Sequence, residues 1–369
     1  MRFCKKCVMP DTRPGITFNK EGVCSACEHF EERKGVDWDK RWKELEALCG
    51  KYRGCNGNGY DCAIAVSGGK DSHFQVHVMK NLMKMNPLLL SVGNYSWTET
   101  GMKNIANISE AFGCDVLSFS PSRKAAKVLL KKALIKYGSP TWYVDAAIYA
   151  YPYKMAVKMG LKLLVYGENV SYEYGGFQKE ETPSAKGQFE NDVVKKIDFS
   201  EWLGDGVTMK DLECVKAPTL EEIEKAGLEP VYLSYYTSWD SHRNYEVSKR
   251  FGFRHLGHEW VREGTLEQYN QIDSLGYLIH QWFKYPKFGH ASATEMASRW
   301  IRYGMMTREE AIPLVKKHDK ILDQGVLDEF LEFIGMAHEE FWNVADNWYN
   351  PKLFEKTRFG TWKEKFELK

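Results

Sequence analysis

The sequence lacks the features of a membrane protein and of a strongly charged protein. No apolar run approaches the ~18 residues of a membrane-spanning helix, and the first residues show no signal-peptide core. Its 51 Lys and Arg residues are balanced by 50 Asp and Glu residues, which leaves a net charge of +1. The basic composition typical of nucleic-acid-binding proteins is therefore missing. We expect a cytoplasmic protein with no membrane span and no nucleic-acid partner, whose nine cysteines are reduced.

The sequence also lacks internal repeats, low-complexity tracts and long linkers. Its 43% hydrophobic and 27% charged residues are ordinary for a globular protein. A length of 369 residues suits two domains and a small appendage. We divide the chain into four segments, which are residues 1–35, 36–58, 59–236 and 237–369.

Four of the cysteines form two knuckles, Cys4-x-x-Cys7 and Cys24-x-x-Cys27. Paired knuckles of this spacing can close a tetrahedral zinc site, and in a reducing compartment a disulfide pairing or simple packing is the weaker alternative. Four thiolates leave no coordination position open, which favours a structural role. We therefore predict a zinc ribbon over residues 1–35.

The most informative stretch is Ser67-Gly68-Gly69-Lys70-Asp71-Ser72, which lies between an apolar run and a helix-compatible run. Glycines let the backbone approach a phosphate, serine hydroxyls and Lys70 can contact it, and Asp71 can hold Mg²⁺. The Walker pattern fails, because Ile64 replaces its first glycine and Asp71 its Ser or Thr. The stretch instead resembles the S-G-G-x-D-S loop of the PP-loop ATP pyrophosphatases, which implies an adenine nucleotide α-hydrolase-like fold.

Alternating strand and helix patterns surround this loop and predict an α/β fold with a parallel sheet. In such sheets the loops that follow the strands share one crevice, where ligands bind. The resemblance to the PP-loop enzymes further implies that Asn94 and Gly167 lie at the ATP site, and that Glu168 and Asn169 lie near the oxygen that is adenylated. The expected strands are 62–66, 88–92, 116–119, 161–166 and 231–233, and the expected helices are 72–85, 98–112, 123–137 and 146–159.

The rest of the chain reads mainly as helices. A linker helix is expected over 37–52, and residues 178–192 look like a mobile loop over the crevice. Beyond residue 237 the pattern is helical, with a capping box at Thr307 and a final helical hairpin. His255 and His258 lack the further histidine of a zincin site, so we expect them to pack or hydrogen-bond.

The C-terminal region resembles the N-acetyl sugar amidotransferases of bacterial surface-polysaccharide and nonulosonic-acid pathways. The resemblance rests on Lys287-Phe288-Gly289-His290, on the stretches 293–299 and 301–311, and on the cysteine knuckles, the PP-loop, 167–169 and 173–176. It spans nearly the whole chain. Ser292 stands where the family pattern leads us to expect arginine, so we assign no anion contact there.

The resemblance implies conversion of an acetamido group to an acetamidino group, as in lipopolysaccharide and O-antigen sugars. ATP would adenylate the amide oxygen, and ammonia would then displace AMP. It also implies roles for Lys70 and Asp71 in catalysis, for the loop residues, Asn94 and Gly167 in ATP binding, and for further residues at the sugar. The implied substrate residues are Glu168, Asn169, Glu173, Tyr174 and Lys287.

The implied cofactors are ATP, Mg²⁺ and Zn²⁺, and the implied partners are a HisH-like glutaminase subunit and a sugar that can be UDP-linked. This chain shows no G-x-C-x-G elbow, and position 2 is Arg rather than Cys. The main alternative is a PP-loop tRNA thiolase, but no cysteine pair remains for a cluster, and tRNA would favour a basic face. A non-catalytic zinc-ribbon interaction protein is the second alternative, and the intact PP-loop argues against it.

Overall fold

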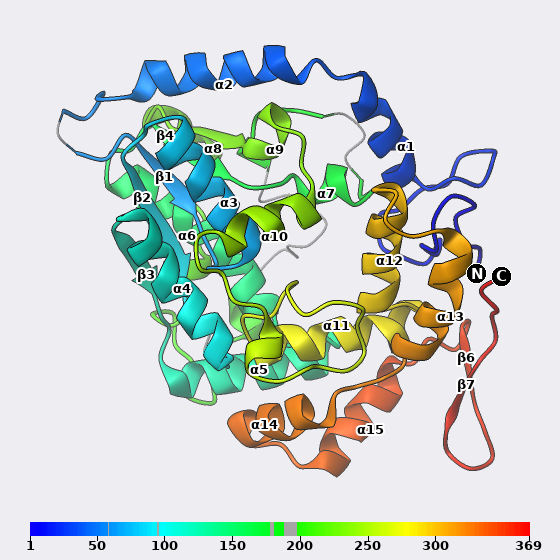
Figure 1. Ribbon diagram of the computed structural model, residues 1–369. Coiled ribbons are helices and arrows are strands. Elements are labelled where there is room, and N and C mark those ends of the chain that lie inside the picture. The colour runs from blue at the N-terminus through cyan, green and yellow to red at the C-terminus, as the bar shows by residue number, and fades with distance from the viewer. Residues whose placement is uncertain (58, 94–95, 178–180, 188–197) are drawn as a thin grey trace.

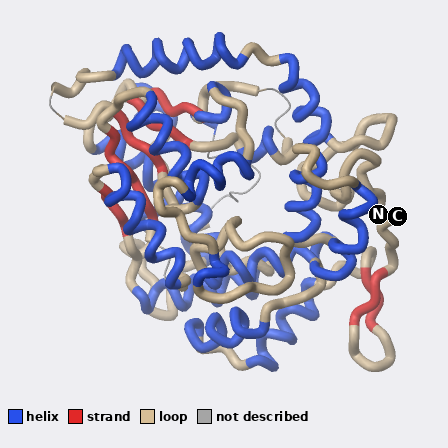
Figure 2. The backbone as a smooth tube through the Cα atoms, viewed as in Figure 1, coloured by secondary structure: helices blue, strands red, loops and turns tan. Residues whose placement is uncertain are grey.

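A five-stranded parallel sheet forms the centre of the protein (Figures 1 and 2). The computed structural model describes residues 1–57, 59–93, 96–177, 181–187 and 198–369. The strand order is β3-β2-β1-β4-β5, and every neighbouring pair is parallel. The predicted α/β class is thus confirmed. The strands are β1 Cys62–Ala65, β2 Pro87–Val92, β3 Val116–Phe119, β4 Leu163–Tyr166 and β5 Glu229–Tyr232.

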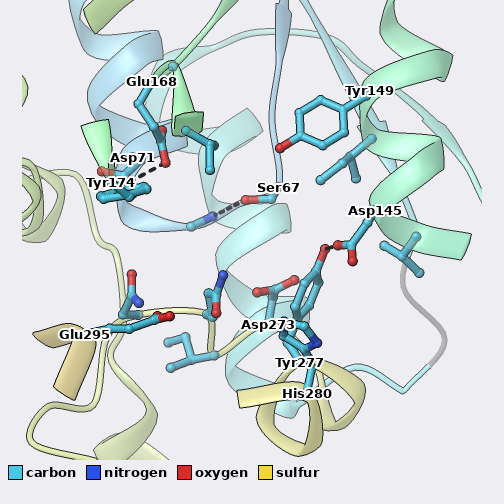
Figure 3. A pocket seen from close by; sticks show the side chains of 18 of the residues that line it. Ser67, Asp71, Asp145, Tyr149, Glu168, Tyr174, Asp273, Tyr277, His280 and Glu295 are labelled. Atoms are coloured by element: carbon cyan, nitrogen blue, oxygen red, sulfur yellow. Dashed lines mark hydrogen bonds between the residues drawn. The ribbon is translucent and has the colours of Figure 1, made fainter. Parts of the chain in front are cut away.

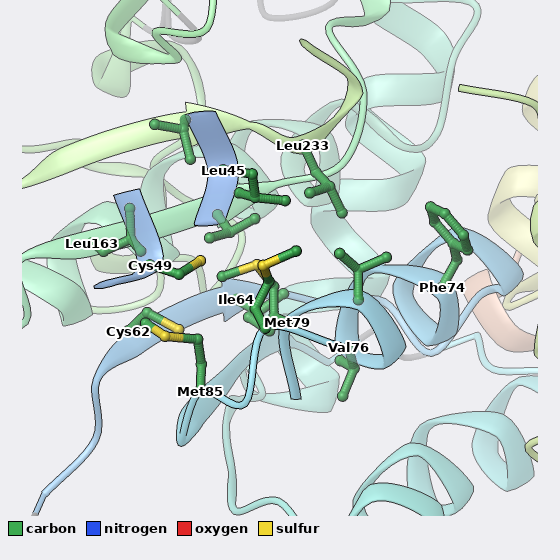
Figure 4. Close-up of a cluster of buried hydrophobic side chains, with 14 of the residues drawn as sticks. Leu45, Cys49, Cys62, Ile64, Phe74, Val76, Met79, Met85, Leu163 and Leu233 are labelled. Carbon is green, nitrogen blue, oxygen red and sulfur yellow. The ribbon is translucent and has the colours of Figure 1, made fainter. Parts of the chain in front are cut away.

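Alternate residues of the strands enter two different cores, as expected for a sheet covered on both faces. Cys62 and Ile64 of β1 pack with helices α2, α3 and α4 (Figure 4), whereas Ala63 faces α6 and α8. These helices are α2 Trp38–Tyr52, α3 Lys70–Val76, α4 Glu99–Phe112, α6 Trp142–Lys158 and α8 Leu220–Lys225. The sheet is therefore buried on both sides, and only its strand ends are free to form a site.

The helices that follow the strands differ from the predictions mainly in where they begin. Helix α3 starts at Lys70 rather than residue 72, because Gly69 is already its N-cap, and it continues as a π-helical segment, His77–Leu82. Helix α6 starts four residues before the predicted position. Helix α5, Arg123–Tyr137, has the predicted bounds, and Ser122 caps it by accepting from Ala125 N.

The N-terminal cysteine segment leads into α1, Ser25–Glu32, and then into α2, which crosses the top of the molecule to the sheet (Figure 1). Asp37 begins α2 by accepting a hydrogen bond from Lys40 N. Leu45 and Cys49 form its buried face, and Trp42 packs at the edge of the same core. The linker helix is thus anchored along one face of the sheet domain.

The C-terminal region is helical and ends in a short β-hairpin that the sequence patterns missed. Thr307 and Glu310 form the predicted capping box, and α14 and α15 form the predicted helical hairpin. The chain ends meet, since the rings of Phe3 and Phe366 are 6.2 Å apart. The elements are α7 Val170–Glu173, α9 Leu233–Tyr236, α10 Ser241–Lys249, α11 Leu275–Phe288, α12 Ser292–Arg302, α13 Arg308–His318, α14 Gln324–Ile334, α15 His338–Trp348, β6 Phe354–Lys356 and β7 Trp362–Glu364.

Part of the segment expected as a loop over the crevice packs against the sheet instead. Residues 178–180 and 188–197 lie outside the described residues. Between them, Ser184 bridges to Val231 of β5, and Ala185 N donates to Pro230 O over 2.9 Å. Residues 181–187 therefore extend the sheet domain. Within the described ranges no helix is long and apolar enough to cross a bilayer.

Candidate active site

A cavity of about 830 Å³ lies outside the carboxyl ends of β1 and β4. The strand order reverses between these two strands, and such switch points are where open α/β sheets bind ligands. All six residues of the 67–72 loop line the cavity, together with Gly167 and Glu168 from the end of β4. The two loops predicted to meet are thus brought together.

The 67–72 loop is held in a tight turn that needs its first glycine. Gly68 has a φ of +83°, and a Cβ there would lie 2.8 Å from the backbone nitrogen of Ile105 in α4. Ser67 N donates to Ser72 Oγ over 2.9 Å, which closes the turn across the start of α3. The close approach of α4 and the Ser67–Ser72 bond fix the loop before any ligand arrives.

Lys70 and Asp71 are held by two asparagines that the sequence analysis did not single out. Lys70 Nζ lies 2.5 Å from Asp71 Oδ2 and donates to Asn270 Oδ1 over 3.2 Å. Asn244 of α10 donates to Asp71 Oδ1 over 2.9 Å. Isolated asparagines give no motif, so neither could be recognised by pattern. They orient the two charged side chains of the loop within the cavity.

Glu168 faces the loop from the end of β4 (Figure 3). Burial raises the pKa of its carboxyl, and the negative charge of Asp71 raises it further. Tyr174 Oη donates to Glu168 Oε1 over 3.3 Å. Carboxylate oxygens are ligands that Mg²⁺ prefers, so Asp71 and Glu168 are the residues of this part of the cavity that could hold a divalent cation.

The remaining predicted substrate residues divide into two groups. Tyr174 and Lys287 line the cavity, and Lys287 Nζ donates to the carbonyl of Tyr137 over 2.8 Å. In the described part of the chain, Asn169 and Glu173 are not among the lining residues. Asn169 caps α7, and Glu173 pairs with Arg33 at 2.6 Å. Asn94 lies outside the described residues.

A second polar group in the cavity was not predicted. Tyr277 Oη donates to Asp145 Oδ1 over 2.8 Å, and Thr141 Oγ1 donates to Asp145 Oδ2 over 2.7 Å. Asp273 and His280 line the same part of the cavity (Figure 3). Burial raises the pKa of both Asp145 and Asp273 to about 6. These residues come from α6, α11 and the loop before α11, far apart in sequence, so no local pattern joins them.

The α11–α12 side of the cavity is also polar. Lys284 and Glu295 form an ion pair at 2.9 Å. Burial alone would raise the pKa of Glu295, but Lys284 holds it well below its usual range. His290 is 1% exposed, and neither ring nitrogen has a hydrogen-bond partner among the described residues. His290 and Glu295 fall within the stretches that carried the family resemblance, where only Lys287 was chosen as a site residue.

The four knuckle cysteines meet as predicted, and all four are buried. Their sulfur atoms lie within 4.8 Å of one another, with Cys7 and Cys24 at 3.7 Å and Cys4 and Cys27 at 4.0 Å. Zn–S bonds of about 2.3 Å in a tetrahedron place the sulfurs about 3.8 Å apart. The cluster therefore fits a structural zinc ion.

We expect about one zinc ion per chain, bound by the four thiolates. Elemental analysis of the purified protein measures it directly. Cys24→Ser should lower zinc content and melting temperature, because a ribbon with so small a core depends on its metal. Cys55→Ser is the matched control, since Cys55 is exposed in the loop before β1. Full stability of the protein without metal would contradict a structural role.

Residues 263–368 match the family described as LPS biosynthesis protein WbpG-like, C-terminal domain. An uncharacterized protein of Methanocaldococcus jannaschii is 23% identical over 177 residues, which cover 48% of this chain and 62% of that protein. The chain thus spans less than two thirds of this curated relative. The solved structure of a predicted tRNA methyltransferase subunit from the same organism also matches, over 51% of this chain and 73% of that chain. The sequence identity is 14% and the TM-score is 0.26, so this likeness is too slight to bear on function.

Proposed function

We propose, from the premise that residues 263–368 form a WbpG-like domain of lipopolysaccharide biosynthesis proteins, that this chain is a sugar-modifying enzyme. Its reaction is the ATP-dependent conversion of an acetamido group to an acetamidino group. The observation that carries the proposal is the cavity at the β1–β4 switch point. One wall of it is the 67–72 loop and another comes from the WbpG-like domain, so a nucleotide and a sugar can meet there.

The chemistry proceeds in two steps. The acetamido oxygen attacks the α-phosphorus of ATP, and pyrophosphate leaves. Ammonia then adds to the activated carbon, a proton is lost, and the carbon–oxygen bond breaks to release AMP and the amidine. An amide oxygen is a poor leaving group, and adenylation makes it a good one. The protein therefore needs to position the substrates and stabilise charge rather than supply a nucleophile.

We assign the roles from the position of each residue in the cavity. Lys70 and the backbone of the loop bind phosphate oxygens. Mg²⁺ held by Asp71, with Glu168 beside it, would offset the charge of the phosphates. Tyr174, whose hydroxyl contacts Glu168, stands at the boundary between the nucleotide and the sugar. Lys287 and the Lys284–Glu295 pair lie on the side left for the sugar.

The test is mass spectrometry of candidate diacetamido sugars, free and UDP-linked, incubated with the chain, ATP, Mg²⁺ and ammonium. We expect the sugar mass to fall by the difference between an oxygen atom and an NH group, with AMP and pyrophosphate formed in equal amounts. Release of ADP would reject the adenylation step. Modification of tRNA in the same mixture, with a sulfur donor present, would favour the thiolase alternative.

A further inference from the structure

The four-cysteine segment is part of the cavity wall. Met9, Arg13, Pro14 and Ala26 line the same cavity as the 67–72 loop. Residues of both knuckle regions are included, since Arg13 and Pro14 follow the first knuckle and Ala26 lies inside the second. A cysteine segment that only stabilised the N-terminal residues would not need to contribute side chains to the cavity.

Each knuckle region is tied to a segment that carries cavity residues. Beside Arg13, Thr12 Oγ1 donates to the carbonyl of Phe288 over 2.5 Å, at the end of α11. Beside Ala26, Ser25 Oγ donates to the carbonyl of Gly175 over 3.1 Å. Phe288 lines the cavity itself, and Gly175 follows Tyr174, which contacts Glu168.

The contact at Gly175 is close enough to require glycine. Its φ is +74°, and a Cβ there would lie 2.6 Å from the backbone nitrogen of Ala26. Nearby, His29 Nδ1 lies 2.9 Å from the carbonyl of Tyr172, and the two rings stack at 4.3 Å. The α1 segment that starts within the second knuckle therefore fixes the backbone on both sides of Tyr174.

The WbpG-like domain holds the cysteine segment from the other side. Arg308 Nε donates to the carbonyls of Cys4 and Cys7, at 3.3 and 3.1 Å. Arg302 of α12 lines the cavity. Next to it in α12, Ile301 packs against the cysteine cluster. Helix α12 thus contacts both the cysteine cluster and the cavity, whereas α13 holds the cysteine segment through Arg308.

We propose that metal binding by the four cysteines positions the substrate wall of the cavity, acting through Thr12 on the end of α11 and through Ser25 and His29 on residues 172–175. The inference rests on the proposed function only in taking this wall as the sugar side. The 67–72 loop has separate supports, because Asn244 of α10 and Asn270 hold its charged residues. Loss of metal should therefore loosen the sugar side and leave the nucleotide loop in place.

Hydrogen–deuterium exchange of the full chain tests this directly. Zinc-loaded protein is compared with protein stripped by a chelator under reducing conditions. We expect severalfold faster exchange in residues 1–30, and also in 171–177 and 286–291, with little change in 66–76 and 241–249. Faster exchange confined to 1–30 would overturn the inference, and so would a uniform increase over the whole chain.

Thr12→Val gives a second test that keeps the metal ligands. Zinc content should stay unchanged, while exchange rises in 286–291 because the bond to the Phe288 carbonyl is lost. Binding of a non-hydrolysable ATP analogue should match the wild type. Thr357→Val, in the exposed turn between β6 and β7, is the matched control and should change none of these quantities.

Unchanged exchange at 286–291 in Thr12→Val would overturn the proposed link. No turnover is measured, so an inactive chain that shows the coupled exchange would reject the proposed reaction and leave this inference standing.

Discussion

Asp71→Asn is expected to reduce release of AMP from ATP by about 10³-fold or more. The reason is that a bound metal ion would stabilise the charge of the transition state by several kcal/mol. The carboxylate lies in the cavity between Lys70 at 2.5 Å and Asn244 at 2.9 Å. Asparagine keeps the size of the side chain, so the fold should survive, but it removes the negative oxygen that would bind Mg²⁺. The measurement is the rate of AMP and pyrophosphate formation with saturating sugar and ammonium.

The matched control is Asp115→Asn. Asp115 is an exposed carboxylate just before β3 that accepts a hydrogen bond from Tyr60 Oη over 2.6 Å, and it lies at the opposite end of the strands. This variant should keep wild-type rates. Circular dichroism and thermal melting of both variants separate a lost reaction from a lost fold. AMP release at the wild-type rate by Asp71→Asn would refute the role assigned to this residue.

Lys70→Ala is expected to lose less activity than Asp71→Asn, because backbone N–H groups of the loop would also bind the phosphates of ATP. Lys70 is buried, with 4% of its surface exposed, and its ammonium group pairs with Asp71. Removing the Lys70 side chain therefore also leaves Asp71 without its closest cation. The rate at high ATP concentration should recover further for Lys70→Ala than for Asp71→Asn.

The parallel sheet and the loop could be predicted because their signals are local. A buried parallel strand is a continuous apolar run, and a glycine turn between such a run and a helix stands out. Helix starts were less certain. The loop residues Lys70 and Asp71 are already helical in the structure. The sequence did not indicate this early start, because a glycine N-cap gives a weaker signal than a Ser, Thr or Asp.

The supports of the site could not be predicted because they come from distant parts of the chain. Asn244 is 173 residues from Asp71, and Asn270 is 200 residues from Lys70. A single asparagine in a helix or loop has no spacing to recognise. Only the fold brings these amides to the loop.

The sequence does not show which of the polar residues after β4 enter the cavity. Asn169 and Glu173 were chosen together with Glu168 and Tyr174, yet one helical turn, α7, turns Glu173 toward Arg33. In the folded protein Glu173 joins the ribbon-side helix to the sheet domain, while Tyr174 faces the cavity. A run of polar residues shows that a site is near, and the backbone decides which side chains enter it.

The cysteines outside the ribbon bear on the source of nitrogen for the proposed reaction. Cys49, Cys62, Cys114 and Cys214 are buried, and burial raises the pKa of each thiol, for Cys214 to about 11 and for Cys49 to about 12. A glutaminase needs a thiolate that is accessible and activated. Cys55 is exposed but does not line the cavity. In the described part of the chain, then, no cysteine outside the ribbon fits a glutaminase nucleophile.

We therefore expect the purified single chain to form the amidine from ammonium chloride at alkaline pH and to form none from glutamine. Ammonium has no lone pair, so the rate should rise with pH as free ammonia increases. Adding a HisH-like glutaminase should restore the use of glutamine, with ammonia passing to the adenylated carbon where water is excluded. Cys55→Ser should keep the wild-type rate with ammonium chloride and, once the glutaminase is added, with glutamine, because the exposed Cys55 thiol has no part in either route. Amidine formed from glutamine by this chain alone would refute the two-subunit arrangement, whereas failure with both sources would reject the proposed reaction itself.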